Sequence, residues 1–238
     1  DILLDLAHRN PDPDPEVREA AIFWLSQVED PRATDALISI LEAGDATPEV
    51  QEKVVFSLAQ QNDPRSLEVL RDYARRPDAP AELRENAIFW IGQQGGGEGF
   101  LMELYGTIED PELRERILFS VAQSRDPESR SWLMERAMDT TETMEVRRSA
   151  LFWAGQSGVA PDEIVRVYRS AADPELREHA VFVLSQASGS DRGAAVDALM
   201  EIARTEEDPE LKEQAVFWLG QSDDPRVADF LLELIRGG

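Results

Sequence analysis

The fold is decided by a seven-residue block, AIFWLSQ at residues 21–27, which places five apolar side chains in a row and ends on a glutamine. Six near-copies follow it: VVFSLAQ, AIFWIGQ, ILFSVAQ, ALFWAGQ, AVFVLSQ and AVFWLGQ. Their phenylalanines recur every 30 to 35 residues, as Phe23, Phe56, Phe89, Phe119, Phe152, Phe182 and Phe217. A repeat of this length predicts a solenoid of stacked helical units.

Each block lies near the end of a helix whose start is also marked. A glutamate stands seven residues before every phenylalanine, and a proline precedes it in five of the repeats. Proline suits the first helical position, and a first-turn glutamate meets the positive end of the helix dipole. These signals predict helices over 14–27, 47–60, 80–93, 110–123, 143–156, 173–186 and 208–221.

A second helix is predicted after each of these, often through another Asp-Pro pair, as at Asp30-Pro31 and Asp224-Pro225. The chain begins with a predicted helix at 2–9 and closes with one at 225–236, and no segment reads as a strand. We therefore expect an all-α protein, with residues 1–238 forming one solenoid of about seven helix pairs and about fifteen helices.

The pattern DPELREHAVFVLSQ, together with DPRVADFLLELI, resembles HEAT repeats of the short bacterial type found in phycobilin-lyase subunits. The resemblance covers essentially the whole chain and implies a right-handed superhelix. Proteins with this fold serve as scaffolds, as peptide receptors and in a few cases as enzymes. The FWLGQS variant is similar to a bacterial subgroup that is often exported.

The block separates into two faces when each phenylalanine is set at zero and neighbours are placed 100° apart. The apolar positions at minus six, minus two and plus two form the stripe that we expect to be buried. The phenylalanine lies opposite, together with the glutamine at plus four and acidic residues. The family resemblance implies the same, because short HEAT repeats commonly carry charged residues at these two positions.

We expect the phenylalanines and glutamines to form two ladders on the concave surface, where they bind a protein segment. A mostly acidic position at minus four lies beside them. The alternative is that the rings and amides hold adjacent repeats together. The candidate protein-binding residues are Phe23, Gln27, Phe56, Gln60, Phe89, Gln93, Phe119, Gln123, Phe152, Gln156, Phe182, Gln186, Phe217, Gln221, Glu52, Glu85, Glu115, Arg148 and Glu178.

Two further positions have structural interpretations. The residue after each phenylalanine alternates in size, as Trp24, Ser57, Trp90, Ser120, Trp153, Val183 and Trp218, which predicts core packing with a two-repeat period. Exposed aromatic anchors for a ligand are the alternative. Five residues before each phenylalanine except Phe56, where Gln51 stands, a basic residue such as Arg84 is expected to pair with a loop carboxylate.

Composition excludes several partners. The net charge of -24 disfavours nucleic acids and anionic membrane surfaces, and favours a cationic partner. No apolar run is long enough to cross a membrane, and residues 1–10 do not read as a signal peptide. The compartment is left open, with export after removal of a presequence as one alternative.

No catalytic or cofactor motif stands out. The chain has no cysteine, and its two histidines, His8 and His179, lie far apart, which disfavours a metal site. The segment NPDPDPE lacks the glycine of a calcium loop, so Asp14 is interpreted as a helix cap. We expect a non-enzymatic scaffold without a cofactor that binds a basic protein or peptide. The alternatives are a structural spacer of a larger protein and a bilin-lyase-like enzyme subunit.

Overall fold

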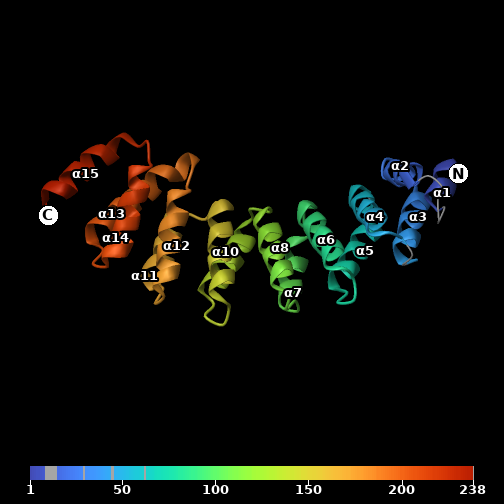
Figure 1. Ribbon diagram of the computed structural model, residues 1–238, viewed down its shortest axis with the longest axis horizontal. Coiled ribbons are helices and arrows are strands. Elements are labelled where there is room, and N and C mark those ends of the chain that lie inside the picture. Colours follow the sequence, from blue (N-terminus) through green and yellow to red (C-terminus); the bar gives the residue numbers. More distant parts are fainter. Residues whose placement is uncertain (9–14, 29, 44–45, 62, 238) are drawn as a thin grey trace. The chain divides into compact units, whose positions relative to one another are not determined.

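The computed structural model describes residues 1–8, 15–28, 30–43, 46–61 and 63–237. These residues contain fifteen α-helices and no strand, which confirms the predicted all-α class (Figure 1). The chain divides into two compact units, residues 1–124 and 125–238, and each is described by itself. The expected cap at Asp14 lies outside the described residues.

The first unit contains α1 to α8. The helices that carry the repeated block, here called block helices, are α2 (Pro15–Leu25), α4 (Pro48–Gln60), α6 (Ala81–Gln93) and α8 (Pro111–Ala122). They pack in sequence order, and each also packs on the helix before it (Figure 1). Those preceding helices are α1 (Ile2–Ala7), α3 (Pro31–Glu42), α5 (Pro64–Arg75) and α7 (Glu98–Tyr105).

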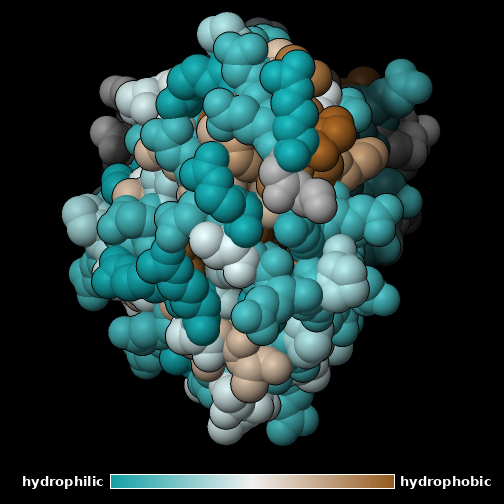
Figure 2. Space-filling model, turned by 90° about the vertical axis from the view of Figure 1, so that its left-hand side faces the viewer, coloured by the Kyte–Doolittle hydropathy of each residue, from teal (hydrophilic) through white to brown (hydrophobic). Residues whose placement is uncertain are grey.

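The second unit repeats this arrangement. Its block helices α10 (Met144–Gln156), α12 (Pro174–Ser185) and α14 (Pro209–Gly220) pack side by side. They pair with α9 (Pro127–Met138), α11 (Pro161–Ser170) and α13 (Arg192–Thr205), and α15 (Pro225–Gly237) packs on α13 and α14. The described residues include no helix that is long and apolar enough to span a membrane. Viewed from the side of α15, the surface is mostly hydrophilic (Figure 2).

The block helices start where the sequence places their caps. Asp110 accepts hydrogen bonds from the backbone N–H groups of Glu112 and Leu113, at 2.9 and 3.4 Å. Thr47 and Thr143 take this role in repeats that lack the Asp-Pro pair. The caps satisfy backbone donors that a helix leaves free at its first turn.

Ion pairs of an Asp-Pro-Arg sequence connect the helices that lie between the block helices. Asp63 caps α5 and also binds Arg65, whose guanidinium holds the pKa of Asp63 at about 2. Arg65 reaches back to Asp35 on α3. The same Asp-Pro-Arg arrangement recurs at Asp224, where Arg226 reaches back to α13. These charges therefore serve the stacking of the repeats.

The predicted apolar stripe forms the core. Positions minus two and plus two are buried in all seven repeats, and position minus six is buried in six of them. The exception is Val17 in the first repeat, which is 39% exposed.

The basic residue at minus five confirms a prediction in one repeat and corrects it in four. Arg177 pairs with the loop carboxylate of Glu206, as expected. In four other repeats the Nε atom of an arginine donates to a backbone carbonyl near the end of the preceding helix, where we expected a loop carboxylate as the partner. The bonds run from Arg18 to Ala7, Arg84 to Ala74, Arg114 to Ile108 and Arg147 to Ala137, at 2.7 to 3.2 Å. The last carbonyls of a helix lack intrahelical donors, and a nearby guanidinium supplies one.

Candidate functional site

The seven phenylalanines lie on the side of the block helices away from the core. None is buried, and Phe23 and Phe217 are 42% and 54% exposed. Their rings also pack on each other in pairs. Phe23 stacks on Phe56, Phe89 on Phe119, and Phe152 on Phe182, with centroids 6.3 to 6.4 Å apart and planes within 13° of parallel. Each of these six rings thus contacts a neighbouring repeat and still presents part of its surface.

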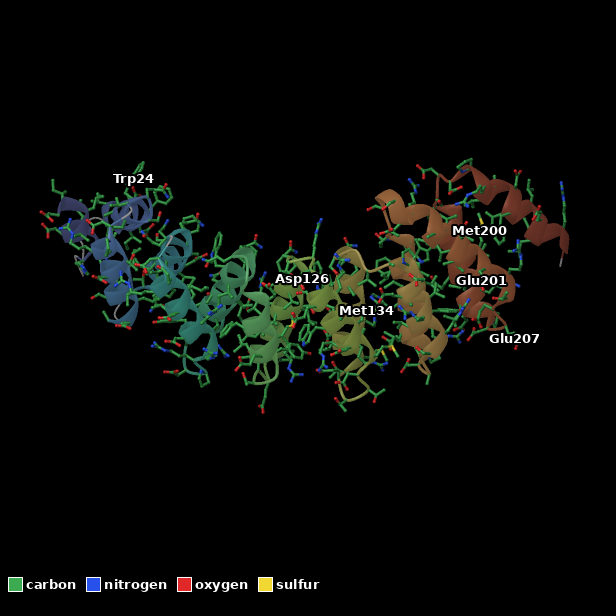
Figure 3. The ribbon with its side chains drawn as sticks, turned by 180° about the vertical axis from the view of Figure 1, so that it is seen from behind. Trp24, Asp126, Met134, Met200, Glu201 and Glu207 are labelled. Atoms are coloured by element: carbon green, nitrogen blue, oxygen red, sulfur yellow. The ribbon has the colours of Figure 1, made fainter. Side chains whose placement is uncertain are left out.

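The tryptophans belong to the same surface, and the prediction that they pack in the core is wrong for Trp24. This side chain is 55% exposed and projects outward from α2, while Trp90, Trp153 and Trp218 are half-buried (Figure 3). Each of the four lies edge-on to the phenylalanine before it, with centroids 5.0 to 5.6 Å apart. Trp24 contacts only Phe23 among the rings of the described residues, whereas Trp90 and Trp218 each also contact a phenylalanine of the preceding repeat.

Together the seven phenylalanines and these four tryptophans form what we call the aromatic stripe. In the first unit, Trp90 joins two stacked pairs, because it contacts Phe56 at 5.3 Å as well as Phe89 at 5.1 Å. In the second unit, Trp218 contacts Phe182 and Phe217 in the same way. The stripe is continuous within each unit.

Close contacts between helices explain why tryptophan alternates with a small residue. A Cβ atom on Gly92 of α6 would lie 2.7 Å from the Cβ of Ser120 on α8. One on Gly155 of α10 would lie 2.5 Å from Val183 on α12. A tryptophan at the place of Ser120 or Val183 would not fit this contact, so the predicted two-repeat period has a steric basis. The sequence carried a further signal in the glycines that follow Trp90, Trp153 and Trp218 by two residues.

The ladder glutamines are all exposed: Gln27, Gln60, Gln93, Gln123, Gln156, Gln186 and Gln221. Different glutamines connect the repeats. Gln61 donates to the carbonyl of Leu25 at 2.7 Å, and Gln94 donates to the carbonyl of Ala59 at 3.0 Å. Sequence reasoning missed this role, although the doublets at 60–61 and 93–94 could have indicated it.

Carboxylates line the other side of the aromatic stripe. The seven glutamates of the first helical turns are exposed, as are Glu52, Glu115 and Glu178 at the minus-four position. Some of these groups have partners within the chain: at minus four, Glu19 pairs with Lys53 and Glu85 with Arg116, and the first-turn residue Glu175 pairs with Arg148 at 2.8 Å. Arg148, the one basic residue among the candidates, thus has an acidic partner of its own.

Grooves lie along the stripe in both units. A groove of about 910 Å³ in the first unit runs from Trp24 to Trp90 and is lined by Phe23, Phe56 and four glutamates. In the second unit a groove of about 560 Å³ lies beside Phe182 and Trp218. The candidate residues are therefore partly gathered into two open sites, one in each unit.

His179 lies in the second of these grooves. Burial, together with the positive charge of Arg148, lowers the pKa of His179 to about 4, so the imidazole is neutral at pH 7. Its ring is 5.5 Å from that of Phe182. Among the described residues, no three histidine, aspartate or glutamate side chains are grouped so that they could hold a metal ion.

Consecutive helices packed in pairs, with one core stripe and one polar and aromatic surface per repeat, define an α-solenoid of short repeats. Residues 1–89 and 161–238 match the family of HEAT repeats, and the chain belongs to this family. HEAT repeats generally act as scaffolds for protein interactions.

Two solved structures are similar to this chain in fold. One is the complex of CpcE and CpcF of phycocyanin lyase from Nostoc sp. PCC7120, with 18% identity, a TM-score of 0.44, and 96% of this chain and 93% of the other covered. The other is human deoxyhypusine hydroxylase, with 19% identity, a TM-score of 0.41, and coverage of 92% and 83%. No curated protein matches the sequence.

Proposed function

We propose that the protein is a non-enzymatic interaction module that binds a basic, extended protein segment along the aromatic stripe. The observation that carries this proposal is the exposure of all seven ladder glutamines beside seven phenylalanines, none of which is buried. A packed helical repeat has no need of an apolar side chain at a solvent-facing position. A large apolar surface bordered by polar groups is typical of an interaction site.

The helix geometry places three kinds of group in parallel rows. With a rise of 1.5 Å per residue, the carboxylates at minus four and minus seven lie about 6 and 10 Å from the phenylalanine, toward the helix start. The glutamine lies about 6 Å away on the opposite side. A segment that crosses the block helices along the stripe meets carboxylates on one side and amides on the other.

The charges favour a basic segment. The groove of the first unit is lined by Glu16, Glu19, Glu49 and Glu52, with Lys53 as its one lysine or arginine. The whole chain carries 48 acidic and 24 basic residues. Complementary potentials accelerate association and select the partner more than they add affinity.

The glutamines favour an extended main chain. A side-chain amide offers two donors and one acceptor oxygen, which match the alternating N–H and C=O groups of a peptide. Gln27 and Gln186 each donate to the hydroxyl of the preceding serine, Ser26 and Ser185, through the amide nitrogen, which leaves the amide oxygen as an acceptor.

Binding of labelled synthetic peptides, followed by fluorescence anisotropy, tests the proposal. The probe alternates Arg or Lys with Ser or Val, and the reference peptide carries Glu at the basic positions. The test variant replaces Gln60, Gln93 and Gln123 with Ala. Three hydrogen bonds at about 0.5 to 1.5 kcal/mol each correspond to at least about a tenfold loss of affinity for the basic peptide.

The control variant replaces Gln61 and Gln94, which bond to backbone carbonyls, with Ala. We expect this control to lower Tm and to leave peptide affinity unchanged. The ladder variant should instead lower peptide affinity and leave Tm nearly unchanged. Equal binding of the acidic and basic peptides, or unchanged affinity in the ladder variant, would contradict the proposal.

A further inference from the structure

An arginine of the chain itself shows how a cation sits on the aromatic stripe. Arg116 projects from α8, three residues before Phe119, and its guanidinium lies 6.0 Å from the centroid of that ring. The same guanidinium is 3.3 Å from a carboxylate oxygen of Glu85 on the neighbouring helix α6. One planar cation therefore contacts an aromatic ring and a minus-four carboxylate together.

The first two repeats use a related pair. Lys53, at the position equivalent to Arg116, lies 3.1 Å from Glu19, at the position equivalent to Glu85. The chain thus supplies its own cation to the minus-four carboxylate of the first and third repeats. In both cases the cation comes from the next block helix along the chain.

Within each unit, one other minus-four carboxylate has a neutral residue where the cation would be. On the next block helix, the position equivalent to Arg116 is Asn86 in the case of Glu52 and Gln214 in the case of Glu178. Glu52 and Glu178 are exposed and make no ion pair among the described residues. Both neutral residues are amides, whose oxygen can accept from a cation.

Each of these carboxylates belongs to a set of four residues that recurs in the two units. In the first unit, Glu52 and Asn86 line the groove with Phe56 and Trp90, whose rings are 5.3 Å apart at 69°. In the second unit, Glu178, Phe182, Gln214 and Trp218 line a groove, and the rings of Phe182 and Trp218 are 5.5 Å apart at 56°. The same groove contains the ion pair of Arg148 with Glu175, and the neutral His179. We call these sets the Glu52 subsite and the Glu178 subsite.

We infer that each subsite takes one arginine side chain of the bound segment, an assignment that rests on the proposed function. The carboxylate binds the guanidinium, the aromatic rings contact its flat face, and the amide oxygen accepts one of its remaining N–H groups. Arginine fits better than lysine, because a planar guanidinium stacks on rings and pairs with a carboxylate through two parallel bonds. Glutamates outnumber lysines and arginines in the lining of both grooves, which disfavours an acidic occupant.

The indole N–H signals of Trp90 and Trp218 in two-dimensional NMR spectra report on the two subsites separately. The full chain is titrated with acetyl-arginine amide, and in parallel with acetyl-lysine amide. The variants are Glu52→Gln and Glu178→Gln, with Glu233→Gln on α15 as a control that removes the same charge elsewhere. Replacement of each tryptophan by phenylalanine assigns its signal.

We expect acetyl-arginine amide to shift both signals in the unmodified protein, and acetyl-lysine amide to bind at least about threefold more weakly. Glu52→Gln should weaken the response of Trp90 about tenfold and leave that of Trp218 unchanged, and Glu178→Gln should do the reverse. Equal responses in all variants, no response, or equal binding of lysine would overturn the assignment. If the basic peptide of the preceding test still binds, only the assignment of the subsites fails. If that peptide does not bind either, the proposed function fails with it.

Discussion

Replacement of Gly92 by alanine tests the close approach of α6 and α8. The added Cβ atom would lie 2.7 Å from the Cβ of Ser120, and 3.1 and 3.2 Å from the backbone O and Cα of the same residue. Backbone atoms cannot rotate away, so the helices must separate. Overpacking of this kind costs about 1 to 3 kcal/mol.

Alanine also favours the helix, which offsets part of this cost. The gain over glycine is about 1 kcal/mol inside a helix and smaller near its end, where Gly92 lies. We therefore expect Gly92→Ala to lower the free energy of unfolding by about 1 to 2 kcal/mol. Gly220 occupies the same place in α14 and has no other atom within 4 Å of a built Cβ, so Gly220→Ala should gain up to about 1 kcal/mol.

Urea unfolding followed by tryptophan fluorescence measures both variants against the unmodified protein. Unfolding of a repeat protein need not be all-or-none, so the transition of each unit is fitted separately. Removing the Cβ of Ser120 in the double variant Gly92→Ala with Ser120→Gly should restore part of the lost stability. The reasoning is refuted if Gly92→Ala proves as stable as Gly220→Ala.

Three more substitutions address single contacts. Gln61→Ala should lower the free energy of unfolding by about 1 kcal/mol, because its amide donates to a backbone carbonyl. Gln60→Ala should change the free energy of unfolding by less than about 0.5 kcal/mol. The midpoints of urea unfolding compare the two variants, and equal losses would contradict the assigned roles. Arg84→Ala removes a buried donor to a helix-end carbonyl and should cost about 1 to 3 kcal/mol, and a loss below about 0.5 kcal/mol in the same assay would contradict that role. The folded-state pKa of His179, about 4, lies below its ordinary value of 6.5, so its contribution to stability is full above pH 6.5 and is lost as the pH falls toward 4. The Tm of the unmodified protein should therefore fall more between pH 7 and pH 4.5 than that of His179→Gln, and parallel curves would exclude this effect.

The core and the helix pairing follow from sequence because they depend on periodic local signals. An acidic first turn marks each block helix, and proline marks the start of five of the seven. The minus-six, minus-two and plus-two positions share one side of each helix. The all-α class, the number of helices and the buried stripe could be predicted from the sequence for this reason. The exposure of Gln60 could be predicted in the same way, from its angle around the helix relative to Phe56.

Contacts between side chains of different helices were harder to predict, because the angular positions of residues around one helix carry no information about which residues lie on the adjacent helix. The position of Arg84 near the core was foreseen, but its partner is a carbonyl of another helix. Trp24 was placed in the core from the alternation in size at its position, although the burial of such a tryptophan depends on contact with a phenylalanine of the preceding repeat. The binding role of the ladder residues remains a prediction.

The contact between Gly92 and Ser120 also limits how such a chain can change its length during evolution. A tryptophan-bearing block helix fits beside one with a small residue, and the two types alternate along the chain. Deleting one repeat of the small type would bring two tryptophan-bearing helices together. Deleting one tryptophan-bearing repeat would bring two helices of the small type together. Gene duplication and loss are therefore expected to proceed in pairs of repeats, in steps of 63 to 66 residues.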